Sequence, residues 1–347
     1  MWIMPHGFIL GESFMELRIH TKQKDYPIYF ERGILSKLKE YLKDTSIGLI
    51  VSDDGVPEKW LSIVQTQYPN VPIYRFKQGE ASKNMNVYQD LLKVMLENHL
   101  SRKDTVLALG GGVVGELVGF ACATYMRGIS YINVPTTTLS QIDSSIGGKT
   151  AIDFMGVKNS VGAFYQPTAA FIDPDTLSTL PKRHFINGLA EAIKEGMTFE
   201  EELFAYFEKD YESHIDEIIY RCLEIKKEIV EEDERENGRR KLLNFGHTIG
   251  HAYESYYELG QYLHGECVAM GMVSILENKE LKARLCRVLE KVGLPTSCDA
   301  NPKEVLRLIQ NDKKTDHNQI TIIQVDEIGK GYLDTWSMKD MERKLGL

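Results

Sequence analysis

The feature that most constrains this fold is an alternation of short apolar runs with helical patterns, which extends from residue 15 to about residue 173. Residues 16–19 and 26–30 are expected to pair as a β-hairpin, and helical spacing recurs at 34–42 and 87–96. The runs expected to form buried strands are 47–51, 71–74, 105–109 and 131–134. Strands that alternate with helices predict a mainly parallel sheet with right-handed crossovers.

Beyond Pro174 the pattern becomes helical almost throughout, as far as about residue 311. Only 320–325 has the character of a strand in this second half. A chain of 347 residues is long enough for two domains, each with its own core. We therefore place a domain boundary near Leu180, with an α/β domain over 15–180 and a mostly α-helical domain over 181–347.

Composition excludes several classes of partner. The formal net charge is -9, from 41 basic and 50 acidic residues, which disfavours nucleic acid. The five cysteines are scattered without a C-x-x-C pair, so neither a disulfide framework nor a thiolate zinc site is expected, and a reducing cytoplasm is predicted. We expect no membrane partner, because the chain lacks an apolar run of about 20 residues. Residues 1–14 do not have the pattern of a signal peptide.

A glycine loop follows the expected strand 105–109. Residues 110–115 fit G-x-G-x-x-G, in which glycines let the backbone approach a pyrophosphate at the N-terminus of a helix. The acidic residue usually found about 20 residues later is absent, so a non-standard dinucleotide site is predicted. Asp53, at the end of an earlier strand, is a substitute candidate for binding a ribose hydroxyl. For both features the alternative is a tight turn that binds no ligand.

Histidines and a carboxylate in the helical half have the spacing of metal ligands. His247 and His251 are four residues apart, so a helix places them on one face, and His264 opens the next expected helix. Glu191 lies on an earlier helix, with Lys194 three residues further on the same face. Imidazoles with a carboxylate suit zinc or a similar ion and leave one position for substrate. The alternative is that these histidines only pack between helices with polar partners.

Basic residues cluster in segments that could bind an anion, although each alone is more often a surface charge. Lys149 and Lys158 follow glycines and are expected in loops, and Arg127 follows the helix after the glycine loop. Further basic residues stand at 239–241, before the histidine helix, and at 313–314. The Gly-Lys-Thr at 148–150 lacks the preceding spacing of a P-loop, so nucleoside triphosphate binding is not predicted.

Taken together, these segments resemble the 3-dehydroquinate synthases, the NAD- and metal-dependent cyclases of the shikimate pathway. The resemblance extends from about residue 15 to about residue 329. It is carried by the segments 79–83, 110–115, 127–128, 135–137, 143–150, 156–159, 191–194, 243–252, 264–266 and 312–314. It implies a Rossmann-like but non-standard dinucleotide-binding α/β domain and an α-helical metal-binding domain, in a cytoplasmic homodimer. It also implies that NAD and the metal act at one site between these domains.

The family's roles transfer to matching positions of this sequence. The resemblance implies that one divalent metal, Zn or Co, is bound by Glu191, His247 and His264. The residues that it implies for NAD are Gly79, Glu80, Lys83, Gly112, Val113, Val114, Gly115, Glu116, Thr136, Thr137, Lys149, Lys158, Thr176, Leu177, Ser178 and Thr179. The residues that it implies for substrate and catalysis are Arg127, Asp143, Lys149, Asn159, Lys194, Lys226, Arg240, Asn244, His251 and one of Lys313 or Lys314.

One position departs from the family. Glu116 stands where the family usually has Asp, so its carboxylate extends one methylene further. If this carboxylate contacts the cofactor, the loop must shift or a water must intervene.

The resemblance implies a phosphorylated sugar acid as substrate, 3-deoxy-D-arabino-heptulosonate 7-phosphate. Its conversion to 3-dehydroquinate and phosphate would use transient oxidation by NAD, elimination of phosphate, re-reduction, ring opening and aldol closure. Three alternatives remain open. One is another cyclase of the superfamily, although such relatives tend to lose the 143–150 segment, which is intact here. The others are a metal-dependent polyol dehydrogenase, which would accumulate NADH, and a regulatory dimer that has lost catalysis.

Overall fold

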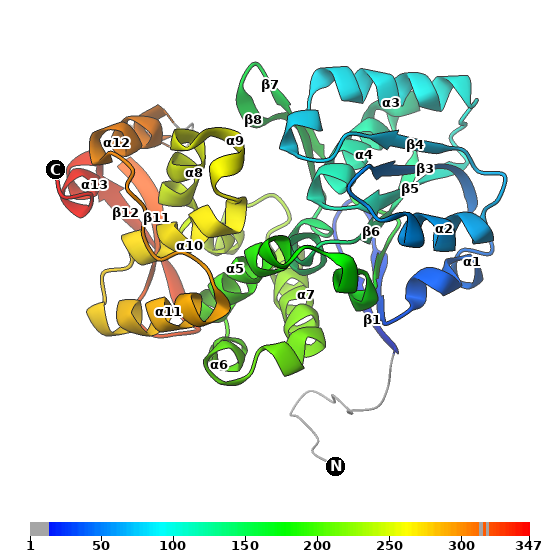
Figure 1. Ribbon diagram of the computed structural model, residues 1–347. Coiled ribbons are helices and arrows are strands. Elements are labelled where there is room, and N and C mark those ends of the chain that lie inside the picture. Colours follow the sequence, from blue (N-terminus) through cyan, green and yellow to red (C-terminus); the bar gives the residue numbers. More distant parts are fainter. Residues whose placement is uncertain (1–13, 312–314, 317–318) are drawn as a thin grey trace, which may run out of the picture. The chain divides into compact units, whose positions relative to one another are not determined.

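The computed structural model describes residues 14–311, 315–316 and 319–347 (Figure 1). The chain divides into two compact units, with the division between Leu180 and Pro181. Unit 1 is built on a mainly parallel sheet and unit 2 is mostly helical, so the predicted fold class is confirmed. None of the described helices is both long enough and apolar enough to cross a membrane.

The sheet of unit 1 has the order β1-β2-β9-β6-β5-β3-β4. β1 and β2 pair antiparallel, as the predicted hairpin requires, and every other neighbouring pair in this sheet is parallel. The bounds of its strands are β1 (Phe14–Ile19), β2 (Tyr26–Glu31), β3 (Ser46–Asp53), β4 (Ile73–Phe76), β5 (Asp104–Gly110), β6 (Ser130–Pro135) and β9 (Ala169–Ile172). The mainly parallel sheet predicted from the alternation is therefore confirmed.

Helices cover both faces of this sheet. They are η1 (Ile34–Lys37), α1 (Leu38–Tyr41), α2 (Glu58–Gln67), η2 (Glu80–Ser82), α3 (Met85–Glu97), α4 (Gly112–Thr124), η3 (Tyr125–Arg127), η4 (Ser140–Ser144) and η5 (Pro174–Thr179). Successive strand residues point to opposite faces: Leu49 and Val51 pack with α3 and α4, whereas Ile50 packs with η1, α1 and α2. Burial on both faces explains why these strands read as continuous apolar runs.

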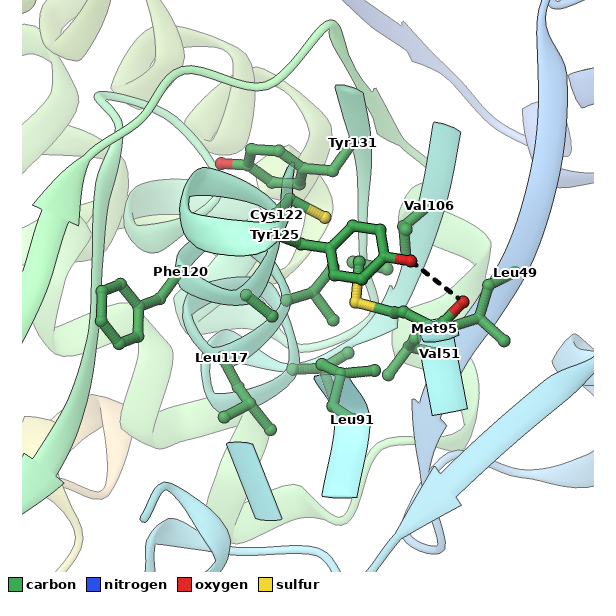
Figure 2. Packing of buried hydrophobic residues seen from close by; sticks show 14 of the residues in the cluster. Leu49, Val51, Leu91, Met95, Val106, Leu117, Phe120, Cys122, Tyr125 and Tyr131 are labelled. Atoms are coloured by element: carbon green, nitrogen blue, oxygen red, sulfur yellow. Dashed lines mark hydrogen bonds between the residues drawn. The ribbon is translucent and has the colours of Figure 1, made fainter. Parts of the chain in front are cut away.

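The core between the sheet, α3 and α4 is shown in Figure 2. Leu91 and Met95 of α3 lie among buried residues of the strands, and neither side chain is exposed to solvent. The hydroxyl of Tyr125 donates to the backbone carbonyls of Met95, at 3.4 Å, and Leu100, at 3.1 Å. These hydrogen bonds connect Tyr125, the residue directly after α4, to the C-terminal end of α3 and the segment that follows it.

A second β-hairpin in unit 1 was not predicted. β7 (Lys149–Phe154) and β8 (Val157–Phe164) pair antiparallel in a sheet of their own. Lys149 and Lys158 were expected in loops, but both lie on these strands, so that expectation was wrong. Most of β8 is exposed to solvent, and an exposed hairpin does not need the apolar alternation that reveals a half-buried strand in sequence.

Unit 2 packs helices around a small antiparallel sheet. Its helices are α5 (Lys182–Thr198), α6 (Glu201–Lys209), η6 (Glu212–His214), α7 (Ile215–Glu232), η7 (Arg239–Asn244), α8 (His247–Tyr256), α9 (Glu258–Gln261), α10 (His264–Ile275), α11 (Lys279–Val292), α12 (Pro302–Asn311) and α13 (Met338–Lys344). Its strands are β10 (Thr315–Asp316), β11 (Gln319–Val325) and β12 (Gly331–Ser337). The expectation that 320–325 is the only strand was wrong, because β12 is largely exposed and carries no apolar alternation.

Leu91 provides a test of the core beside α3. We expect Leu91→Ala to lower the free energy of unfolding in urea by about 2–5 kcal/mol, because it leaves a cavity in a packed interior. Leu96→Ala on the same helix is the matched control, since Leu96 is 60% exposed, and we expect a change within about 0.5 kcal/mol. Equal effects of the two substitutions would contradict the packing described for α3.

Candidate functional site

The carboxyl ends of the parallel strands form a binding edge in unit 1. The crossover from β3 to β4 moves in one direction across the sheet, and the crossover from β5 to β6 moves in the other. The strand order therefore reverses between β3 and β5, and open parallel sheets bind ligands at such a reversal, outside the carboxyl ends of the strands. Asp53 ends β3 and Gly110 ends β5, so both predicted cofactor segments lie here.

The glycine loop connects β5 to α4 as the sequence predicted. α4 begins at Gly112, and among the described residues no side chain caps its N-terminus. A Cβ on Gly112 would lie 2.9 Å from the Ser144 hydroxyl oxygen, so only glycine fits without a shift. A Cβ on Gly115 would lie 3.0 Å from the Asn133 amide, which reflects the close packing of α4 on β6. The first-turn amides of α4 can thus receive a pyrophosphate, and this loop fits a dinucleotide.

The other residues assigned to NAD follow neighbouring strands at the same edge. Gly79, Glu80 and Lys83 follow β4, and Thr136 and Thr137 follow β6. Thr176, Leu177, Ser178 and Thr179 form part of η5, directly after β9. Because the carboxyl ends of parallel strands share one edge of a sheet, these distant segments meet around the glycine loop.

Asp53 has a structural role in the turn after β3. One oxygen of its carboxylate accepts hydrogen bonds from the amides of Gly55, at 2.9 Å, and Val56, at 3.1 Å. Burial raises the pKa of Asp53, and these amide bonds oppose the shift. The geometry accounts for Asp53 as a turn residue, and its assignment to a ribose hydroxyl stays a prediction.

Lys149, Asn159 and Glu116 line one pocket of unit 1, with a volume of about 370 Å³. Glu116 belongs to α4, whereas Lys149 and Asn159 belong to the β7–β8 hairpin. Asn159 has a φ of +50°, which is rare for a residue other than glycine. Lys158 is exposed on β8 and is not among the residues that line this pocket.

Arg127 and Asp143 complete the predicted residues of unit 1. Arg127 is exposed at the end of η3, with a φ of +66°. Asp143 lies in η4, a single turn that follows Thr137. Backbone in the left-handed region costs free energy and is often found at functional sites.

The predicted metal ligands converge in unit 2. Glu191 of α5, His247 of α8 and His264 of α10 place their ligand atoms within 4.8 Å of one another. Glu191 Oε1 lies 3.7 Å from His247 Nε2 and 3.4 Å from His264 Nε2. Glu191 is 1% exposed, and within the described residues its Oε1 has no hydrogen-bond partner. A divalent cation would satisfy this buried oxygen, so the residues fit a metal ion.

Neighbouring groups orient both imidazoles. His247 Nδ1 lies 3.1 Å from the carbonyl oxygen of Phe245, which favours a proton on Nδ1 and leaves Nε2 free to bind a metal. His264 Nδ1 lies 3.5 Å from Glu254 Oε2, so His264 has a carboxylate on either side. Sequence reasoning missed both partners, because a backbone carbonyl carries no residue signature and Glu254 is one of many helical glutamates.

The three ligands have shifted pKa values. Burial holds the pKa of His247 well below its usual value, so this imidazole is neutral. Burial opposes the charged form of His264, but the neighbouring carboxylates of Glu191 and Glu254 raise its pKa to about 10. Burial also disfavours the Glu191 carboxylate, yet Lys194, His247 and His264 together hold its pKa well below the usual range.

Glycines bring the ligand-bearing helices together. A Cβ on Gly271 of α10 would lie 2.1 Å from the Gly246 carbonyl oxygen, at the start of α8. A Cβ on Gly250 of α8 would lie 3.0 Å from the Cys267 carbonyl oxygen of α10. The two backbones therefore pack against each other, which sets the ring centroids of His247 and His264 5.3 Å apart.

The predicted substrate cations of unit 2 are buried. Lys194 is 1% exposed and forms an ion pair with Glu191, and Lys226 and Arg240 are 4% and 1% exposed. Arg240 donates to the backbone carbonyl of Glu234 through its guanidinium. Buried cations need compensating partners, so these residues are not ordinary surface charges.

Two further predicted residues of unit 2 lie close to these groups in the chain. His251 is one turn after His247 on α8, with its ring centroid 5.2 Å from that of His247. Asn244 ends η7, and its side-chain amide donates to Glu236. Lys313 and Lys314 lie outside the described residues.

Solved structures with this fold define the class of protein. A 2-epi-5-epi-valiolone synthase from Streptomyces hygroscopicus, with NAD+ and Zn2+ bound, matches with a TM-score of 0.85 and 25% identity, covering 94% of this chain and 97% of that one. A 2-deoxy-scyllo-inosose synthase complexed with carbaglucose-6-phosphate, NAD+ and Co2+ matches with a TM-score of 0.83 and 23% identity, covering 95% and 99%. The fold is that of the sugar phosphate cyclases.

Sequence comparison narrows the class. The family model described as 3-dehydroquinate synthase N-terminal matches residues 73–187, and the C-terminal model matches 188–315. The 3-dehydroquinate synthase of Clostridium kluyveri is 40% identical over 333 residues, which cover 90% of this chain and 92% of that protein. The chain belongs to the 3-dehydroquinate synthase family, whose members are lyases. The resemblance inferred from the motifs is therefore confirmed, and a cyclase of another family is not supported.

His247 provides a test of the metal centre. We expect His247→Ala to reduce bound Zn from about one ion per chain to none, since it removes one of three protein ligands. Metal content after dialysis, measured by atomic emission, gives the result. His184→Ala is the control, because His184 is an exposed residue of α5 outside the cluster, and it should keep its metal. Unchanged stoichiometry in His247→Ala would refute the ligand set.

Metal affinity should depend on pH through His264. With a pKa of about 10, His264 is protonated at neutral pH in the metal-free protein, and a metal needs its free lone pair. Binding at pH 7 should therefore release about one proton, and affinity should fall as the pH is lowered from 10. Titration calorimetry in two buffers of different ionisation enthalpy measures the released proton. A buffer-independent enthalpy would contradict the raised pKa.

Proposed function

We propose that this chain acts as an NAD- and divalent-metal-dependent 3-dehydroquinate synthase. The proposed reaction converts 3-deoxy-D-arabino-heptulosonate 7-phosphate to 3-dehydroquinate and phosphate, with no net oxidation. The observation that carries the proposal is the convergence of Glu191, His247 and the half-buried His264 in a member of this family. Solved structures of related cyclases contain NAD+ with Co2+ or Zn2+. They support the proposed dependence on NAD and the proposed dependence on a divalent metal.

Unit 1 would hold the cofactor at the carboxyl edge of its parallel strands. The amides of Gly112, Val113 and Val114 would bind the pyrophosphate at the N-terminus of α4. Thr136 and Thr137 after β6, and η5 after β9, would contact the rest of the dinucleotide. When bound, NAD supplies reversible hydride transfer, which the side chains of a protein cannot provide.

Unit 2 would hold the metal and the reacting hydroxyl. Glu191, His247 and His264 would be the protein ligands and leave a position for substrate. The bound ion supplies a Lewis acid that lowers the pKa of a hydroxyl and polarises a carbonyl. Either Zn or Co suits imidazole and carboxylate ligands.

The remaining side chains would bind charge and move protons. Lys194, Lys226 and Arg240 are buried cations that can neutralise the carboxylate and phosphate of the substrate. Asn244 and one of Lys313 or Lys314 are assigned to the substrate by the family resemblance. His251, one turn from His247, would relay protons at an imidazole nitrogen.

The assigned residues of unit 1 would act on the same substrate. Arg127, Lys149 and Asn159 would bind its anionic and hydroxyl groups, and Lys158 would contact the cofactor. Asp143 is assigned to proton transfer by the family resemblance. We also propose, from the family resemblance, that the protein is a cytoplasmic homodimer.

Phosphate release provides the direct test. Purified protein supplied with the heptulosonate phosphate, NAD+ and Zn or Co should release phosphate, and EDTA should abolish the release because it removes the ion. Absorbance should show no lasting accumulation of NADH, whereas a polyol dehydrogenase would accumulate it steadily. Absence of phosphate release above the EDTA control would refute the proposal, and a regulatory dimer without catalysis would give that result.

A further inference from the structure

The pocket of unit 1 that contains Lys149 and Asn159 has two walls. One wall is α4, which contributes Glu116, and the other is the β7–β8 hairpin. The hairpin is a separate sheet with its outer strand exposed, so its own pairing does not fix its position. Its tip, Phe154 and Met155, is 42% and 85% exposed. Ile152 of β7 is fully buried and packs in one core cluster with α4, so apolar contacts hold the inner half of the hairpin. The outer half, beyond Ile152, needs a different contact to hold it.

Lys83 contacts both walls beyond this packed part. Its side chain is 4% exposed, although it follows η2 in a short connecting segment. Its ammonium group lies 2.9 Å from Glu116 Oε2 on α4 and 2.7 Å from Glu80 Oε1 in its own segment. A lysine this deeply buried is rare, and it is stable only where opposite charges compensate it.

The backbone of the same residue contacts the hairpin. The Lys83 carbonyl oxygen accepts a hydrogen bond of 2.8 Å from the Asp153 amide of β7, beside a parallel bridge between Asn84 and Asp153. Asp153 Oδ1 in turn accepts a 2.8 Å bond from the amide of Asn159. Asn159 has a φ of +50°, a conformation that persists only where its surroundings hold it. A chain of contacts thus runs from Glu116 through Lys83 and Asp153 to Asn159.

Charge strengthens this arrangement. Glu80 and Glu116 contact the ammonium group of Lys83. Burial raises the pKa of Asp153, and the hydrogen bond from the Asn159 amide and the Lys83 charge oppose that shift. Without the Lys83 cation, the carboxylates of Glu80, Glu116 and Asp153 would repel one another. Separation of the 80–83 segment and the β7–β8 hairpin from α4 would relieve this repulsion.

We propose that Lys83 is a positioning residue that ties the outer half of the β7–β8 hairpin, from Asp153 to Asn159, to α4 and thereby fixes Asn159 in the wall of the pocket. Glu116 is its counter-ion, and this explains the departure from the usual family residue. An Asp at this position would be shorter by about 1.5 Å, so its carboxylate would not reach the Lys83 ammonium group in its present position. The proposal deepens the proposed function and rests on it, since Lys149 and Asn159 are there assigned to the substrate.

Hydrogen exchange of the ligand-free protein tests the tie without any assumption about activity. In Lys83→Met, we expect the amides of Asp153 and Asn159 to exchange about tenfold faster, because the hairpin opens more often. Amides in β5 and β6 should be unchanged, whereas a general loss of stability would affect them too. Lys93→Met is the matched control, since Lys93 is a lysine of α3 whose side chain is 71% exposed.

Two further variants keep the test decisive. Lys83→Arg keeps the charge and should restore most of the hairpin protection, which a role in packing alone would not predict. If Lys83→Met fails to fold, Lys83→Met/Glu116→Gln avoids an unpaired buried carboxylate and should still show the faster hairpin exchange. Wild-type exchange of the hairpin in the double variant would overturn the proposal.

Calorimetric titration with NAD+ separates this proposal from the proposed function. Lys83 is itself assigned to NAD+, so its positioning role is tested by the exchange experiment and not by the Kd alone. We expect Lys83→Met to raise the Kd for NAD+ about tenfold, and Lys93→Met to leave it unchanged. Absence of NAD+ binding to the wild-type protein would refute the proposed function, while the exchange experiment would still decide the role of Lys83. An unchanged Kd together with unchanged exchange in Lys83→Met would refute the positioning role.

Discussion

Unit 2 depends on the burial of one carboxylate. Glu191 is almost completely removed from water, and a buried charge is tolerated only when opposite charges and hydrogen-bond donors surround it. Lys194 compensates one carboxylate oxygen, and His247 and His264 face the other. Gly246 and Gly271 let α8 and α10 approach each other, and Gly265 lets α10 approach α5, which brings both imidazoles to Glu191. Burying the Lys194–Glu191 ion pair costs free energy of desolvation, and this cost is consistent with a metal centre rather than with a purely structural core.

Unit 1 depends on a different constraint, the common direction of its strands. In a parallel sheet every carboxyl end lies on one edge, so the loops after β3, β4, β5, β6 and β9 meet although they are far apart in the chain. The glycine loop provides helix amides at that edge, and Lys83 joins the edge to the exposed hairpin. The same geometry explains why the residues assigned to NAD come from scattered segments.

The metal ligands were predicted with more support than the basic residues. The spacing of His247 and His251 placed both on one helical face, with Glu191 and His264 as further candidates. The family resemblance then assigned Glu191, His247 and His264 as the ligands, and these three converge. Lys149 and Lys158 had no comparable local signal, and their strands were missed because an exposed hairpin needs no apolar alternation. Glu254 and Asp153 were not identified, since their roles depend only on neighbours that are distant in sequence.

The sequence by itself determined the class of fold, the division near Leu180, the glycine loop and the family. These properties depend on periodicity and on motifs that are local in the chain. Tertiary structure decided which of these residues meet: that Glu191 faces two imidazoles, that Asp53 caps its own turn, and that Lys83 contacts both α4 and the β7–β8 hairpin. The physical reason is that burial and charge compensation are properties of packed neighbours, and a linear pattern does not specify those neighbours.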